Sequence, residues 1–194
     1  MQSNKEIIKL LDKHKPAWYS LGFRYENPPS AVRYFCTPMR ALIFASLGVD
    51  GIHYCIIPSL GDFVFVVNPM PADDRHVIPV AANLAEFLSL VHTLEGTQLL
   101  DQMILWDEAQ FNEQWSAHRE AKDDARTAEL DELASLFEVT QLADPYNYVR
   151  SIADSFDGSR IEYSHEYYDT LGLVPVKHRA NDFVSVIVKH IPKK

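Results

Sequence analysis

The chain has few cysteines and no long apolar run, so it lacks the features of disulfide-rich and membrane-spanning proteins. Its 194 residues include two cysteines, Cys36 and Cys55, which are too few for a disulfide framework. They indicate a reduced, intracellular protein, with one disulfide as the open alternative. No apolar run approaches the roughly 20 residues of a membrane span. The first 15 residues interleave charges with Ile and Leu, which is typical of a short amphipathic helix and not of a secretory signal. We therefore expect a cytoplasmic protein without a membrane partner.

Glycine is also scarce, and its placement argues against two classes of enzyme. The seven glycines are scattered along the chain, so no Gly-rich phosphate-binding loop is present. The chain also has no G-x-S-x-G elbow of the kind that presents a nucleophilic serine. The sequence therefore predicts no catalytic residue from these motifs, and we expect a protein that is not an enzyme.

Positive charge is scarce in one segment of the chain. The net charge is −9, and residues 101–138 hold eleven acids against three bases, so nearly all of the excess lies there. Nucleic-acid binding needs a basic patch, which argues against that class of partner. An acidic surface instead suits a basic protein partner, and a merely solvated face is the alternative. The candidate contacts are Asp107, Glu108, Glu120, Asp123, Asp124, Asp131 and Glu132.

Apolar and turn residues alternate through the first half of the chain in a way that predicts an antiparallel meander. Strands are expected at 41–47, 52–57 and 63–68, with a possible fourth at 76–80, because β-branched and aromatic residues favour strands. Asp50-Gly51 supplies the positive φ angles of a tight hairpin turn. Residues 15–30 are expected to form a loop. The fold class is therefore α+β, a meander sheet flanked by helices.

Helical patterns flank the expected sheet. They cover 4–14, 30–35, a helix that starts after Asn83, 97–117, 119–139 and 148–156, and the two helices over 97–139 carry the acidic segment. Asn83 followed by Glu86 is close to a capping box. Short strands are expected at 160–164 and, at the end of a C-terminal extension, at 183–191. We expect one α+β domain over 1–194, with a helical and C-terminal extension from about residue 97 as the alternative organisation.

Histidine, cysteine and tyrosine form the remaining candidate sites. His53 and Cys55 point to one face of a strand, but a metal site needs three or four ligands, so we expect them to pack and bind no metal or cofactor. "HEYYD" (165–169) resembles half of a zinc-binding helix, with Asp169 in place of the second histidine. Tyrosine is favoured where one end of its side chain contacts water. The tyrosine-rich region at 146–168 therefore has two alternative roles, packing within the fold and contact with a partner. Its candidate contacts are Tyr146, Tyr163 and Tyr167.

The strands, the stretch "PVAANLAEFLSL" (79–90) and the following helices resemble the SUKH superfamily over about residues 18–92. The matching positions are Val80, Ala82, Asn83, Glu86, Phe87 and Leu88, and the turn "GVDGIHYCII" resembles the family's glycine-rich hairpin. The family's Trp/Leu-Pro-x-x-(Tyr/Phe) motif is only approximated, by Trp18 and residues 29–35, and residues 97–194 carry no family motif. The resemblance implies an α+β binding module without a catalytic site, of a kind that often serves as an immunity protein against bacterial toxins.

Together these features predict a protein-binding module, in the form of a SUKH-like immunity protein. It would neutralise a toxin by covering a basic cleft with its acidic face, while tyrosines supply buried anchors. Two alternatives stay open. One is a small hydrolase with a metal or carboxylate site near His53, His165 and Asp169, and the other is a regulatory scaffold without catalytic activity.

Overall fold

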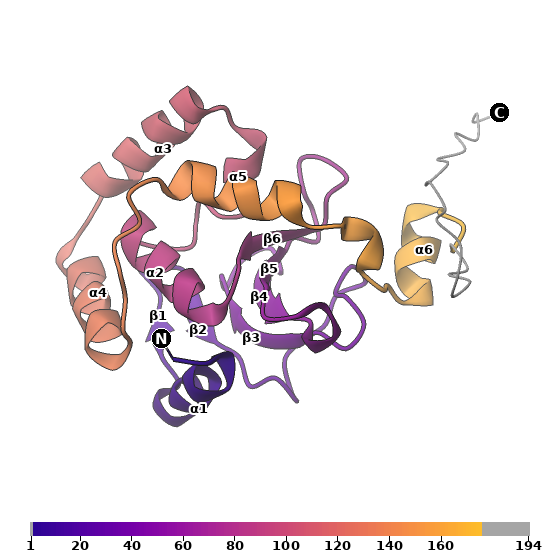
Figure 1. The fold of residues 1–194 in the computed structure, drawn as a ribbon, viewed down its shortest axis with the longest axis horizontal. Coiled ribbons are helices and arrows are strands. Elements are labelled where there is room, and N and C mark those ends of the chain that lie inside the picture. The colour runs from indigo at the N-terminus through magenta and orange to yellow at the C-terminus, as the bar shows by residue number, and fades with distance from the viewer. Residues whose placement is uncertain (1, 176–194) are drawn as a thin grey trace.

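A single antiparallel sheet forms the centre of the molecule (Figure 1). The computed structural model describes residues 2–175. Six strands follow one another in chain order, each paired with the next. They are β1 (Ala17–Trp18), β2 (Phe23–Tyr25), β3 (Leu42–Ser46), β4 (His53–Ile56), β5 (Val64–Val67) and β6 (Val77–Ala81). The α+β class and the meander are confirmed, whereas the strand expected at 183–191 lies outside the described residues.

The turn between β3 and β4 has the predicted geometry. Asp50 and Gly51 both adopt left-handed backbone angles, with φ of 52° and 71°. Such angles suit glycine and are tolerated by aspartate. The turn fixes the register in which Tyr54 and Ile56 point to one face of the sheet and His53 and Cys55 to the other.

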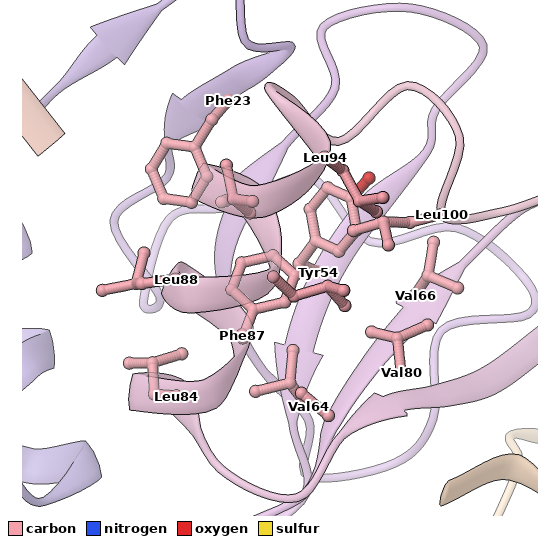
Figure 2. Packing of buried hydrophobic residues seen from close by; sticks show 14 of the residues in the cluster. Phe23, Tyr54, Val64, Val66, Val80, Leu84, Phe87, Leu88, Leu94 and Leu100 are labelled. Atoms are coloured by element: carbon pink, nitrogen blue, oxygen red, sulfur yellow. The ribbon is translucent and has the colours of Figure 1, made fainter. Parts of the chain in front are cut away.

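The main core lies between the sheet and α2 (Leu84–Leu94) (Figure 2). Phe87 of α2 packs against Tyr54 and Phe44, with ring centroids 5.1 Å and 5.6 Å apart. The Asn83 side chain accepts a hydrogen bond from the Glu86 backbone, so the predicted N-cap is confirmed. The predicted first helix is also confirmed, as α1 (Asn4–His14), and it contributes Ile7 and Leu11 to this core.

The two long helices predicted over 97–139 are wrong in their boundaries. The structure has a short 3-10 helix, η2 (Met103–Leu105), then α3 (Glu108–Glu120) and α4 (Asp124–Leu136). Asp107 and Asp123 each cap the following helix. An N-cap residue has a non-helical backbone, so a helix cannot run through either position.

The face of the sheet that carries Cys55, which we call the second face, is covered by a loop and by the segment that follows the fifth helix. The covering residues come from 31–41 and from the region after α5 (Pro145–Ser155), which contains η3 (Gly158–Arg160) and α6 (His165–Leu171). A further short 3-10 helix, η1 (Pro58–Leu60), connects β4 to β5. The helix predicted at 30–35 is absent from this loop, and 161–164 is not a strand. Ile161 is instead buried against this face as an irregular segment.

No helix among the described residues has the length and apolar character needed to cross a membrane.

Candidate functional site

Helices α3 and α4 lie at the end of the molecule opposite α6 (Figure 1). Phe111 of α3 and Leu130 and Leu133 of α4 face the core, and most polar residues of both helices are exposed. Five acids here are exposed and make no hydrogen bond or ion pair within the described part of the chain. They are Glu108, Glu113, Glu120, Asp124 and Asp131, and we call them the acidic surface. Glu113 was not among the sequence candidates, although its position opposite Phe111 on the helix is visible in the spacing.

Two of the three bases of the acidic segment pair with Glu95, the C-cap residue of α2, and the third bonds to α3. Arg119 Nε and Lys122 Nζ lie 3.5 Å from the two carboxylate oxygens of Glu95. Arg126 donates a 2.6 Å hydrogen bond from its guanidinium to the backbone oxygen of His118. Glu95 offsets one of these three positive charges, so the five acids of the acidic surface outnumber the positive charge that remains in their own segment.

Two of the sequence candidates are helix caps. A carboxylate oxygen of Asp107 accepts a hydrogen bond from the Gln110 backbone at 2.8 Å, and that of Asp123 accepts one from the Arg126 backbone at 2.8 Å. Both carboxylates stay exposed, so they contribute charge to this end of the molecule. Their directional bonds, however, serve the helices, since an N-cap side chain satisfies a free amide of the first turn.

Glu132 also has a structural contact. Its Oε2 accepts a 2.8 Å hydrogen bond from the indole nitrogen of Trp18, and Oε2 of Glu129, one turn earlier, accepts one from the Leu21 backbone at 3.0 Å. These two glutamates attach α4 to the β1–β2 hairpin. Sequence reasoning missed the contact because the partners lie more than 100 residues apart.

The three candidate tyrosines divide into two environments. Tyr146 is buried against Phe111, and its hydroxyl donates a 2.8 Å hydrogen bond to the Trp106 backbone oxygen. It is therefore a core residue, and we leave it out of the proposed contact surface. Tyr163 and Tyr167 are half-buried and stack on each other, with ring centroids 3.9 Å apart, over the second face of the sheet. Burial raises the pKa of both phenols.

His53 is enclosed on the second face of the sheet. Its Nδ1 lies 2.8 Å from the Gly51 backbone oxygen and its Nε2 lies 3.2 Å from Thr37 Oγ1. The Gly51 carbonyl can only accept, so Nδ1 carries the proton and Nε2 accepts from the threonine. Burial lowers the pKa of His53 and favours this neutral form. The predicted orientation of His53 and Cys55 is confirmed, but both are fully buried where half coverage was expected.

The alternative hydrolase site involves residues in different surroundings. His165 and Asp169 are exposed on α6, whereas both ring nitrogens of enclosed His53 already have partners. Among residues 2–175, no group of three or more His, Cys, Asp or Glu side chains is arranged to hold a metal ion. The geometry that a metal-dependent hydrolase requires is therefore not assembled from these three residues.

Comparisons of the chain with protein-family models, with curated proteins and with solved structures found no match.

Proposed function

We propose that the chain is a cytoplasmic protein-binding module that docks its acidic surface on a basic protein partner. The observation that carries the proposal is the separation of charge at α3 and α4. The segment's three bases bind Glu95 and the His118 carbonyl, while five acids have no partner within residues 2–175. Unpaired charges of one sign steer an oppositely charged partner and set its orientation.

The resemblance to SUKH domains supports a finer form of the proposal. The partner would be a toxin domain with a basic, nucleic-acid-facing cleft, and the chain would neutralise it by covering that cleft. An acidic surface on rigid helices suits this task, because it presents negative charge where the toxin would otherwise hold phosphates. The proposed compartment is supported by Cys36 and Cys55, which are both free thiols.

Charge neutralisation tests the proposal. The variant carries Glu113→Gln, Glu120→Gln and Asp131→Asn, three changes on exposed positions outside the first turn of either helix. We expect its free energy of unfolding to stay within about 0.5 kcal/mol of the wild type, as is usual for surface substitutions. Quantitative pull-down from the source cell should recover much less of the basic partner with this variant than with the wild type.

A matched control separates docking from net charge. Asp74→Asn, Asp154→Asn and Asp169→Asn remove the same charge from exposed positions outside α3 and α4. This control should recover the partner as the wild type does. Association of the wild type with its partner should slow with added salt, because salt screens exposed charges beyond about 8 Å at physiological ionic strength. Equal recovery by all three proteins would show that the acidic surface is only solvated.

A growth experiment tests the toxin form of the proposal. In cells that express the toxin partner, co-expression of the wild-type chain should restore growth, and co-expression of the surface variant should fail to do so.

A further inference from the structure

A separate pocket lies beside the β3–β4 turn, outside α3 and α4. Its volume is about 290 Å³. Its lining comes from β2 and the residue after it, the loop at 31–34, strand β3, the turn at 48–51 and the start of β4 with His53. Three apolar or aromatic side chains of the lining are unusually exposed: Val32 at 69%, Val49 at 57% and Tyr34 at 40%. Exposed apolar side chains grouped around a hollow are typical of a binding site.

Two acidic residues of the lining, Glu26 and Asp50, have carboxylate oxygens that accept no hydrogen bond among residues 2–175. Oε1 of Glu26 accepts from Arg24 Nε at 3.2 Å, from Arg24 Nη2 at 3.1 Å and from Ser46 Oγ at 2.7 Å. Its Oε2 accepts no hydrogen bond within residues 2–175. The carboxylate of Asp50, held in the turn by a left-handed backbone, also makes no hydrogen bond or ion pair among the described residues.

Apolar surface next to acceptor oxygens fits a long side chain with an apolar stem and a cationic head. We propose that this pocket binds a lysine or arginine side chain of the basic protein partner, an inference that rests on the proposed function. The stem would lie along Val32 and Val49, and the cation would bind Glu26 Oε2 and Asp50. One face of the Tyr34 ring stacks on His53, with ring centroids 5.7 Å apart, and the opposite face would attract a cation placed over it.

Charge complementarity favours this occupant over a purely apolar one. An apolar side chain would cover the two carboxylates without replacing their hydrogen bonds to water, which is costly. A cation replaces those bonds with charge-assisted ones. Arg24 opposes the cation, since it also lines the pocket. Its guanidinium is held by Glu26, and the charged residues of the lining sum to a net negative charge.

The test uses three small probes in an NMR titration of the full chain: the N-acetyl N-methylamides of arginine, lysine and norleucine. Norleucine carries the apolar stem without the charge. We expect arginine and lysine to shift the backbone amide signals of Tyr34, Val49 and Gly51 with saturable, weak affinity, and norleucine to bind much more weakly. Glu26→Gln and Asp50→Asn should each weaken arginine binding by about tenfold, the usual loss when a hydrogen bond to a charged group is removed. Asn tolerates the left-handed backbone at position 50.

Two further variants separate a direct effect on binding from misfolding, because misfolding cannot tighten binding. Arg24→Gln should tighten arginine binding severalfold, because it removes the opposing cation, and Asp74→Asn should leave binding unchanged. Norleucine binding as tight as arginine, or shifts that are indifferent to Glu26→Gln, would overturn the proposal. The absence of any shift at the pocket would do the same. The probes need neither the partner nor the acidic surface, so this outcome is independent of the pull-down that tests the proposed function.

Discussion

The indole nitrogen of Trp18 donates a 2.8 Å hydrogen bond to Oε2 of Glu132, and so joins β1 to α4 across 114 residues of the chain. Trp18 is fully buried and packs on Phe23 and Phe137. Glu132 therefore has a structural role, which distinguishes it from the neighbouring acids that form the acidic surface.

Replacement of Glu132 tests that assignment. Glu132→Ala should lower the free energy of unfolding by about 1–2 kcal/mol, because it leaves the indole N–H without its acceptor. Glu132→Gln should cost less, since its amide oxygen can still accept. Glu113→Ala is the matched control on an exposed position of α3 and should change stability by no more than about 0.5 kcal/mol. Urea unfolding measures all three, and equal stability of Glu132→Ala and Glu113→Ala would show that the Trp18 contact contributes nothing.

The β3–β4 turn gives a second prediction. Gly51→Val should destabilise the chain by more than about 1 kcal/mol, because a β-branched residue is strained at positive φ. A Cβ at position 51 would also lie 2.6 Å from the Tyr34 ring and 3.0 Å from Pro69.

Gly48 separates the two causes. Its φ is 89°, but a Cβ there would meet nothing within 4 Å. Gly48→Ala should therefore show the backbone strain alone, and Gly51→Ala should cost more than Gly48→Ala. If the two alanine variants unfold at the same urea concentration, the close approach of Tyr34 to the turn is not a constraint on residue 51.

Burial of His53 predicts a loss of stability in acid. Its lowered pKa means that the unfolded chain takes up a proton more readily than the folded protein. The contribution of His53 to stability is therefore complete above its ordinary pKa of about 6.5 and is lost as pH falls through the lowered value. Between pH 7.5 and 5, the wild type should lose more unfolding free energy than His53→Asn. His14→Asn, at an exposed histidine, should behave as the wild type does, and an identical loss in all three proteins would exclude His53 as the source.

The two thiols should be inert in the folded protein. Burial raises the pKa of Cys36 to about 11 and that of Cys55 to about 12. The thiolate is the reactive form, so a buried thiol of high pKa reacts slowly. A thiol reagent that reports by absorbance should find almost no reactive cysteine in native protein at pH 8 and two in urea. Rapid reaction of native protein would contradict the burial of both thiols.

Local chemistry explains which parts of the fold could be predicted. The Asp50-Gly51 turn, the Asn83 cap and the strands β3–β6 depend on neighbouring residues and on apolar patterns within a few positions. Asp107-x-x-Gln110 is also a local signal, a complete capping box. The apolar spacing over 97–117 predicts a helix that runs through this position, but the capping box begins α3 at Glu108.

Other elements depend on distant partners. Strands β1 and β2 are two and three residues long, too short for a pattern, and they exist because β2 pairs with β3. In the loop predicted as a helix at 30–35, the Arg33 guanidinium instead donates to the backbone oxygens of Pro38 and Ala41. These contacts close the loop on itself, and the buried Cys36 and Ala41 of the loop pack on the second face of the sheet, against residues distant in sequence.

Strands β3–β6, the turn between β3 and β4 and the concentration of acid at 101–138 follow from residue types in short stretches. The contacts that those acids make depend on how the helices pack. The fold brings Arg119 of α3 and the following Lys122 to Glu95 at the end of α2, and it brings Trp18 of the β1–β2 hairpin to Glu132. It also places Glu26 and Asp50 in one pocket from different segments. A hydrogen bond or ion pair forms within a few ångströms, and only the folded chain brings residues so distant in sequence that close.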